Sequence, residues 1–375
     1  MTNSSSPSTA QRVNVAVVGL GFMGVTHLRA YLSNPLARVV AVCDAVRVPV
    51  NGVLGGVAGN IKKSDDIHLG PEVKVFRKLE ELLADPEVQL VDLCTPTPLH
   101  PEQAIAALKA GKHVLCEKPL ARTSAAAREI LKVAAVSPGM LMPAMCMRFW
   151  PGWAWLKQVV AKQTFGKVLA ANFCRVSAMP AWSQQGTYAG GSDLGGALFD
   201  LHIHDTDFVN YLFGRPTSVF SSGVVGAGGS VNHVVTHYHF PGGPAVHAEG
   251  SWLLTQGFNM SYTLHCEQAT LDFDLSRGAE ALRVTQPGKV PRTISCDGPD
   301  GYGAEINYIV DCVANDRPPQ IVTAEDGLTA LEICEAEERS LRTGTVEKLL
   351  TPALAKLKLP PQTQCTPLLV SNSLA

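Results

Sequence analysis

The stretch that decides the fold runs from Val13 to Asp44 and reads VNVAVVGLGFMGVTHLRAYLSNPLARVVAVCD. It opens with the apolar, β-branched run Val13–Val18, which predicts a strand buried on both faces. The glycine pattern GxGxxG follows, then a helical stretch over Val25–Leu32 and a second apolar strand over Arg38–Val42. This order of strand, glycine turn, helix and strand predicts a dinucleotide-binding unit.

Each glycine of the turn has its own task in such a unit. Gly19 makes the tight turn, Gly21 lets the backbone approach a pyrophosphate, and Gly24 lets the helix pack closely against the strand. Phe22 and Met23 lie at the helix N-terminus, which faces the phosphate charge. These five residues are therefore predicted to bind the cofactor.

Asp44 ends the second strand, twenty residues beyond the last glycine. A carboxylate there accepts hydrogen bonds from a ribose 2′-hydroxyl and repels a 2′-phosphate, so the sequence favours NAD. Arg47 is interpreted as a solvated loop cation in preference to a partner for that phosphate. NADP therefore stays open as the second cofactor.

The overall composition limits the function classes. The chain has 375 residues, of which 46% are hydrophobic and 17% charged, which predicts two globular domains. A formal net charge of −2 offers no basic footprint for nucleic acid, and no apolar run is long enough to span a bilayer. The ten cysteines are scattered without a CxxC pair, which predicts free thiols in the cytoplasm.

The pattern of elements changes once along the chain. Over residues 12–147 strands and helices alternate across short connections, which predicts an α/β domain with a doubly wound parallel sheet of the Rossmann type. Over residues 148–350 strand-like segments dominate, including Ala245–Leu253 and Asn259–Cys266, and predict an α+β domain with a large, mostly antiparallel, open-faced sheet. Residues 1–11 are expected to be a disordered leader, and residues 351–375 a C-terminal extension.

Polar residues follow two of the predicted parallel strands. Thr95, Pro96 and His100 come after the strand Val88–Cys94, and Glu117 and Lys118 come after His113–Cys116. Ligands of such sheets lie at the carboxyl ends of the strands, so these residues are expected at the cofactor. A lysine there can stabilise an alkoxide beside a nicotinamide. On these residues alone, a surface lysine at the start of a loop is the favoured alternative.

A second candidate group lies on the predicted helix Ala197–Phe213. Asp200 and His204 are four residues apart, which places their Cβ atoms about 6 Å apart on one face of an α-helix. A carboxylate and an imidazole together can transfer a proton. The alternative is an exposed helix with unrelated polar groups.

A metal site is not favoured by the histidines of the second domain. His233, His237 and His239 fall on one side of a predicted strand, and His247 lies on the next. No acid or cysteine completes an obvious ligand set, so a polar sheet face explains them better. Trp182, in a glycine-flanked loop, is expected to form a wall of the substrate site.

Several runs together resemble the Gfo/Idh/MocA family of oxidoreductases, which includes glucose–fructose oxidoreductase and inositol dehydrogenase. The resemblance extends over roughly Val13 to Leu349. It is carried by the glycine turn and by AALKAGKHVLCEKPLA (Ala106–Ala121), MRFWP (Met147–Pro151), GGALFDLHIHDTDFVNYLFG (Gly195–Gly214) and YGAEINYIVDCVANDRPPQIVTAEDG (Tyr302–Gly327). One departure is Thr97, where the family often has asparagine.

The resemblance implies a function and a site. It implies that Lys118, Asp200 and His204 form the catalytic group, and that a sugar or polyol carbon is oxidised or reduced with NAD or NADP. It implies that Arg148 lies near the substrate, with an interdomain ion pair as the alternative. It also implies a homodimer or homotetramer formed through the open sheet.

Two other functions fit the same scaffold. A redox-neutral glycosidase would oxidise its substrate transiently and keep the cofactor bound. A non-catalytic sensor would bind the cofactor and control a partner, but it has no need of the three candidate catalytic residues. The dehydrogenase is therefore the favoured hypothesis.

Overall fold

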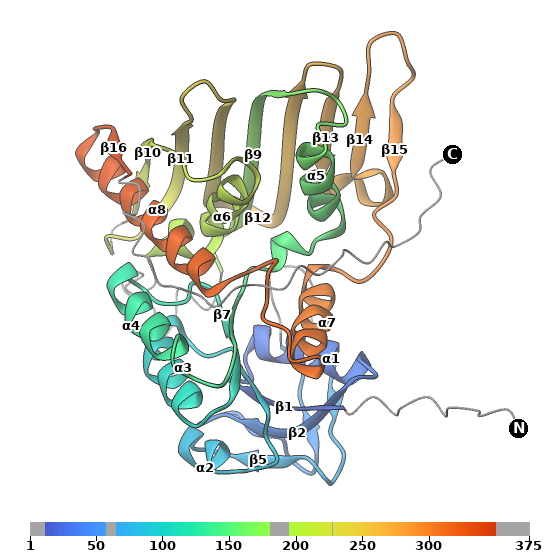
Figure 1. The fold of residues 1–375 in the computed structure, drawn as a ribbon, viewed down its shortest axis with the longest axis vertical. Helices are drawn as coiled ribbons and strands as arrows, with labels where there is room; N and C mark the ends of the chain where they lie inside the picture. The colour runs from blue at the N-terminus through green and yellow to red at the C-terminus, as the bar shows by residue number, and fades with distance from the viewer. Residues whose placement is uncertain (1–11, 58–64, 181–194, 227, 350–375) are drawn as a thin grey trace, which may run out of the picture.

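The computed structural model describes residues 12–57, 65–180, 195–226 and 228–349. The predicted leader, the predicted C-terminal extension and Trp182 lie outside the described residues. The described chain forms two large sheets, one above the other in Figure 1, with helices packed against each. The predicted combination of a parallel Rossmann sheet and a large antiparallel sheet is confirmed.

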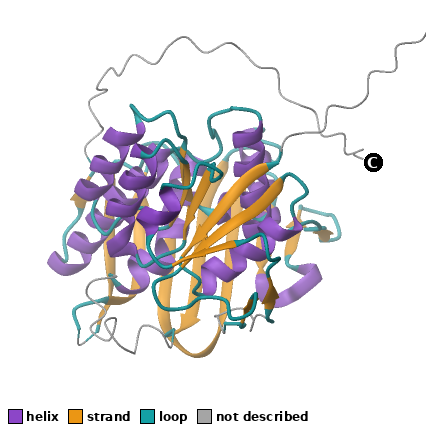
Figure 2. Ribbon diagram, turned by 90° about the horizontal axis from the view of Figure 1, so that it is seen from below, coloured by secondary structure: helices purple, strands orange, loops and turns teal. Residues whose placement is uncertain are grey.

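The first sheet is parallel and has six strands in the order β5-β2-β1-β6-β7-β8. The strands are β1 (Val13–Val18), β2 (Ala37–Cys43), β5 (Lys74–Phe76), β6 (Leu90–Leu93), β7 (His113–Glu117) and β8 (Leu141–Ala144). Its helices are α1 (Phe22–Ser33), α2 (Leu79–Leu83), α3 (His100–Lys109) and α4 (Ser124–Ala134). Figure 2 shows the strands running between groups of helices.

Short elements complete this half of the chain. The strands β3 (Val53–Leu54) and β4 (Ile67–His68) form a separate pair, and the short helices η1 (Thr97–Leu99) and η2 (Cys146–Arg148) follow β6 and β8. The strand β8 ends at Ala144, because the chain then turns into η2.

The second sheet has eight strands, with the path β15-β14-β13-β12-β11-β10-β16 and β9 paired to β12. The strands are β9 (Val168–Ala178), β10 (Ser218–Val225), β11 (Val231–His239), β12 (Ala245–Cys266), β13 (Thr270–Asp274), β14 (Leu282–Thr285), β15 (Arg292–Ile294) and β16 (Glu347–Lys348). The helices α5 (Pro151–Ala161), α6 (Ile203–Phe213) and α8 (Ala324–Thr343) cover one face of it (Figure 1). The short helix η7 (Leu275–Glu280) joins β13 to β14.

The two strands expected over Ala245–Leu253 and Asn259–Cys266 are the two halves of the single long strand β12. Both halves pair with β9, because Ala171 lies opposite Val246 in one half and opposite Leu264 in the other. Gly257, with φ of +82°, lies in the exposed turn between them. The strand β9 is therefore enclosed on both sides by one later segment.

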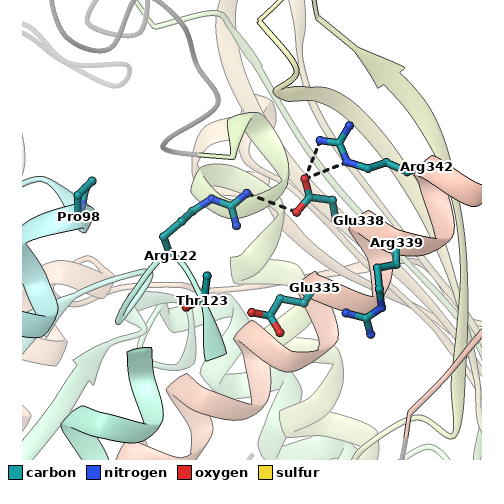
Figure 3. A pocket seen from close by; sticks show the side chains of 7 residues that line it. All are labelled: Pro98, Arg122, Thr123, Glu335, Glu338, Arg339 and Arg342. Atoms are coloured by element: carbon teal, nitrogen blue, oxygen red, sulfur yellow. Dashed lines mark hydrogen bonds and ion pairs between the residues drawn. The ribbon is translucent and has the colours of Figure 1, made fainter. Parts of the chain in front are cut away.

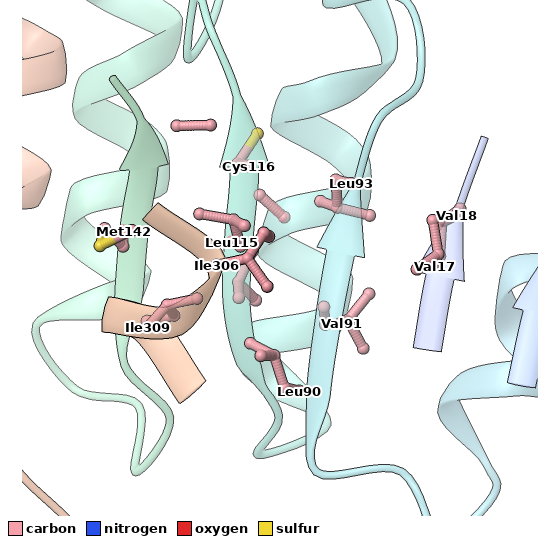
Figure 4. Packing of buried hydrophobic residues seen from close by; sticks show 14 of the residues in the cluster. Val17, Val18, Leu90, Val91, Leu93, Leu115, Cys116, Met142, Ile306 and Ile309 are labelled. Carbon is pink, nitrogen blue, oxygen red and sulfur yellow. The ribbon is translucent and has the colours of Figure 1, made fainter. Parts of the chain in front are cut away.

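Helix α7 (Gly301–Ala314) lies in sequence within the predicted second domain but packs in the core of the first. Ile306 and Ile309 are fully buried in the same cluster as Val17, Leu90 and Leu115. Figure 4 shows the two isoleucines against the parallel strands. The chain thus returns to the first sheet after it has built most of the second.

The face of the second sheet away from its helices carries the histidines. His237 lies opposite Phe220 on one side and His247 on the other, and the rings of His237 and His247 are 5.7 Å apart. Phe220 and His237 are exposed. The sequence predicted that His233, His237 and His239 share one face of the sheet. The burial pattern of β11 agrees, because the alternate residues Val234, Thr236 and Tyr238 are buried.

None of the helices among the described residues combines the length and the apolar character needed to cross a membrane.

Replacement of Gly24 by alanine tests the close packing of α1 on the sheet. A Cβ at Gly24 would stand 1.8 Å from the carbonyl oxygen of Gly19, whereas a Cβ at Gly21 has no atom within 4 Å. We expect Gly24→Ala to lower the free energy of unfolding by about 1–3 kcal/mol, the usual cost of overpacking. Urea unfolding measures this, with Gly21→Ala as the matched control, and equal stability of the two variants would contradict the packing.

Candidate active site

A cavity of about 140 Å³ lies between the carboxyl ends of the parallel strands and the helix side of the second sheet. Its walls come from both halves of the molecule and include Met23, Lys118, Trp150, Arg175, His204 and Tyr302. The glycine turn contributes Met23, and β9 contributes Arg175. The cavity therefore brings together residues that are far apart in the sequence.

Lys118 enters this cavity directly after β7. Its Nζ donates to the Asp200 carboxylate at 2.8 Å and to the Asp200 carbonyl oxygen at 2.7 Å. Burial lowers the pKa of Lys118, but the Asp200 and Glu117 carboxylates outweigh burial and hold its pKa above 10.5. The lysine is therefore a cation at neutral pH with a fixed direction.

The segment that carries Asp200 is a short π-helix rather than the first turn of an α-helix. The π-helix η6 (Leu198–His202) leads into α6, so the helix expected over Ala197–Phe213 changes its winding at the site. Such π-turns are frequent at functional sites. The alternative of an exposed helix is wrong, because Asp205 and Asp207 of α6 are buried.

His204 lines the same cavity as Lys118 and Asp200, the group that the resemblance implied. Among the described residues, its Nδ1 atom is buried without a hydrogen-bond partner. Burial and the cations Lys118 and Arg175 hold the pKa of His204 well below 6.5. The imidazole is therefore neutral at pH 7 and able to accept a proton.

Arg175 is a site residue that the sequence analysis missed. Its guanidinium is paired with the Asp205 carboxylate at 2.8 Å and lies 5.3 Å from the ring centre of Trp153. The available signal was its position in the alternating strand β9, where it shares the inward parity of Phe173. A charged side chain at an inward-facing strand position needs a partner of opposite charge, and such residues often belong to a functional site.

The glycine turn has the geometry that a dinucleotide needs. Gly19, with φ of +87°, and Gly24 have no room for a side chain, whereas the space over Gly21 is open. Gly21 is the residue directly before α1, whose first amide groups have no partner within the helix. This open cradle at a helix N-terminus fits a pyrophosphate.

Asp44 is held firmly beside this turn. Its carboxylate accepts hydrogen bonds from the backbone amides of Leu20 at 2.7 Å and of Arg47 at 2.8 Å. The guanidinium of Arg47 donates to the carbonyl oxygens of Leu20 and Gly55. The arginine thus joins two loops through hydrogen bonds to backbone oxygens. Neither of these two contacts is with an acidic side chain.

The sequence predicted that His100 lies at the cofactor site, but the structure places its ring elsewhere. The ring is 1% exposed, and its two nitrogens lie 2.7 Å from the carbonyl oxygen of Thr95 and 2.9 Å from that of Pro119. It therefore joins the loop after β6 to the loop after β7. Thr95 is held in turn by a 2.5 Å hydrogen bond from its hydroxyl to Gln103, and Pro96 precedes η1.

Arg148 is also placed away from the cavity. Its guanidinium makes two hydrogen bonds to the Asp207 carboxylate, at 2.6 and 2.9 Å, and an ion pair with Asp326 at 3.0 Å. Its side chain is 2% exposed. Arg148 is therefore held in ion pairs and not at the substrate cavity, and because both acids lie within residues 148–350, these pairs join elements of the second domain and are not interdomain as the alternative expected.

A larger hollow of about 780 Å³ lies between the loop after Lys118 and α8 (Figure 3). Its arginines are paired with acids: Arg122 and Arg342 with Glu338, and Arg339 with Glu347. Its lining includes none of the three candidate catalytic residues. Each of the three arginines thus has an acidic partner, although two of them share Glu338.

Comparison with known proteins adds independent support. The family model described as "Oxidoreductase family, NAD-binding Rossmann fold" matches residues 13–145, and the model of the GFO/IDH/MocA C-terminal domain matches residues 153–272.

Two curated relatives and one solved structure are similar. Levoglucosan dehydrogenase of Pseudarthrobacter phenanthrenivorans is 32% identical over 216 residues, which are 56% of this chain and only 53% of that protein. Myo-inositol 2-dehydrogenase of Thermotoga maritima is 26% identical over 348 residues, 90% of this chain and 98% of that protein. A levoglucosan dehydrogenase structure in complex with NADH and L-sorbose superposes with a TM-score of 0.75 at 22% identity, covering 90% of this chain and 99% of that one, which shows a shared fold.

The buried pair of Arg148 and Asp207 should contribute strongly to stability. Removing Asp207 leaves the buried guanidinium of Arg148 with Asp326 alone as its acidic partner, so we expect Asp207→Asn to cost up to ~3–5 kcal/mol in urea unfolding. Glu280, which pairs with Arg283 at the surface, provides the control. Glu280→Gln should change stability by less than ~0.5 kcal/mol, and an equally small effect of Asp207→Asn would contradict the burial of the pair.

Proposed function

Because the chain belongs to the Gfo/Idh/MocA family of oxidoreductases, we propose that it transfers a hydride between NAD and a hydroxyl-bearing carbon of a sugar, inositol or related polyol. One observation carries this proposal. A cationic lysine and a neutral histidine line the same cavity as Met23 of the glycine turn. These are the groups that the oxidation of an alcohol requires beside a nicotinamide.

The roles of the residues follow from their charge states. In the oxidation direction, Nδ1 or Nε2 of His204 takes the proton from the reacting hydroxyl while the C–H bond releases its hydride and a carbonyl forms. The Nζ of Lys118 donates a hydrogen bond to the same oxygen and stabilises the negative charge that develops there. Asp200 holds Lys118 in the required direction, because its carboxylate and its carbonyl oxygen both accept from Nζ. The nicotinamide, when bound, supplies the hydride acceptor.

NAD is the proposed cofactor, with its pyrophosphate over Gly21 and its adenosine ribose beside Asp44. The Asp44 carboxylate is fixed by backbone amides close to the turn, where it would accept from a 2′-hydroxyl and repel a 2′-phosphate. The relatives named above support this choice, since one of them was solved with NADH.

The substrate class is inferred from the cavity and from the relatives. The relatives act on levoglucosan and on myo-inositol by their names, and Trp150 offers an aromatic wall within the cavity of this chain. Neither the redox-neutral glycosidase nor the sensor is favoured by the comparisons. Trp182 remains the proposed second aromatic wall.

The organisation of the protein completes the proposal. We place the dinucleotide-binding domain at residues 12–147 and the substrate domain at residues 148–350, with α7 contributed to the first core. A homodimer or homotetramer would cover the open face of the second sheet, where Phe220 and Val224 are exposed. A cytoplasmic location fits the nine described cysteines, which are all free. Light scattering of the purified protein measures the assembly.

The experiment that tests the function is a titration of NAD and NADP by fluorescence, followed by a panel of sugars and inositols. We expect tighter binding of NAD, and formation of reduced nicotinamide with at least one polyol of the panel. NAD binding without turnover of any substrate would favour the sensor, and cleavage of a nitrophenyl glycoside without net NADH release would favour the glycosidase.

Loss of the lysine should remove catalysis and keep cofactor binding. We expect Lys118→Met to lower kcat by ~10²–10³-fold, the usual contribution of one donor to a developing oxyanion, while the Kd for NAD stays close to that of the parent. Lys109→Met, at the exposed end of α3, serves as the control and should retain full activity. Full activity of the Lys118 variant would exclude this lysine from the mechanism.

The pH profile should reflect the two charge states. His204 must be neutral to accept a proton, and its pKa is lowered below 6.5, so activity is lost only as the pH falls through that lowered value. Lys118 stays protonated until the pH rises above 10.5. We therefore expect kcat/KM for alcohol oxidation to form a plateau from pH 6.5 to 10. An acid limb centred near pH 7 would contradict the assignment of His204 as the base.

A further inference from the structure

A buried histidine on the cofactor-binding helix contacts two carboxylates. His27 of α1 is fully buried, and its Nδ1 lies 2.9 Å from Oδ2 of Asp92, on β6. Its Nε2 lies 3.3 Å from Oε1 of Glu117, the last residue of β7. The ring therefore stands between the ends of two neighbouring strands.

Glu117 continues this contact to the catalytic lysine. Its second oxygen, Oε2, accepts a hydrogen bond from the backbone N–H of Lys118 at 2.9 Å. The helix of His27 begins directly after Gly21, at the proposed pyrophosphate site. One chain of contacts thus runs from the helix that would hold the cofactor, through His27 and Glu117, to the backbone of Lys118.

The surroundings require a positive charge on His27. Two carboxylates in a low-dielectric interior need a cation between them, and the imidazolium form supplies it. Nδ1 is hydrogen-bonded to Asp92, whereas the contact of Nε2 with Glu117 is an ion pair without hydrogen-bond geometry. Burial lowers the pKa of His27, and the Asp92 carboxylate, which is hydrogen-bonded to Nδ1, opposes this effect and keeps the pKa above 6.5. Cys94 donates its S–H to Oδ1 of Asp92 at 3.4 Å.

Burial shifts the remaining titratable groups around this ring toward their neutral forms. Tyr31 follows His27 by one turn of α1, and α7 brings Tyr302 and Glu305 to the same region. Burial raises the pKa of Glu305 well above 4.5, and among the described residues neither of its oxygens has a hydrogen-bond partner. The pKa values of both tyrosines are likewise raised by burial, so both stay neutral.

We propose that His27 is a positioning residue, which as an imidazolium holds the Glu117 carboxylate and thereby fixes Lys118 relative to the helix that binds the cofactor. The inference rests on the proposed function for its catalytic consequence. It assigns a role in the reaction to a residue that contacts neither the substrate nor the cofactor.

The kinetic test is a double-mutant cycle. We expect His27→Gln and Glu117→Gln each to lower kcat by ~10–100-fold through misplacement of the lysine, with a change of less than ~3-fold in KM for NAD in His27→Gln. Because both act through one contact, the double variant should be no slower than the slower single variant. If the reductions in kcat of the two single variants instead multiply in the double variant, the inference is overturned.

A matched control separates positioning from general loss of stability. Leu28 is the next residue of α1, is fully buried, and lies in the apolar core. Leu28→Ala should lower the unfolding midpoint and leave kcat within ~3-fold of the parent, and its effect should multiply with that of Glu117→Gln. A loss of kcat in Leu28→Ala equal to that in His27→Gln would overturn the inference.

The charge of His27 is measured without turnover. In protein labelled with ¹³C at Cε1 of histidine, we expect a resonance that is absent from His27→Gln and keeps an imidazolium shift from pH 6 to 8. The same resonance should move toward the neutral shift in Glu117→Gln. A neutral His27 ring in the parent would overturn this inference, whereas inactivity of the parent on every polyol would overturn the proposed function, so the two failures are distinguishable.

Discussion

A lysine at the end of a parallel strand and an aspartate 82 residues later meet at 2.8 Å, and the arrangement of the site depends on this ion pair. Both groups are largely removed from water, so each would carry an uncompensated desolvation cost without the other. The pair joins the carboxyl end of β7 in the first sheet to the π-turn before α6. The cavity between the two halves therefore has a wall that is fixed by charge as well as by packing.

The same principle applies to the rest of that helical segment. Asp205 and Asp207 of α6 are buried, and each is paired with an arginine from another element, Arg175 of β9 and Arg148 of η2. Three carboxylates within eight residues thus find three cations that come from different parts of the chain. The acidic segment thus joins β9 of the second sheet, the short helix η2 and Lys118.

The sequence predicted the local features and missed those that depend on distant contacts. The glycine turn and the bounds of β1 follow from residues close in the chain, and both are observed. The enclosure of β9 by β12 could not be predicted, because its pairing depends on residues about 80 positions away. His27 gave no signal either, since its partners Asp92 and Glu117 meet it only in the folded state. Spacing alone likewise could not distinguish a π-turn from an α-helix at Asp200.

The packing of α7 in the first core has a consequence for the order in which the chain matures. Residues 12–147 alone would leave the apolar surface beneath Ile306 and Ile309 open to water. During synthesis, which proceeds from the N-terminus, that surface stays uncovered until more than 300 residues have emerged. The nucleotide-binding half is made first but is among the last parts to be completed. We expect a chaperone to engage the nascent chain while this surface is still uncovered.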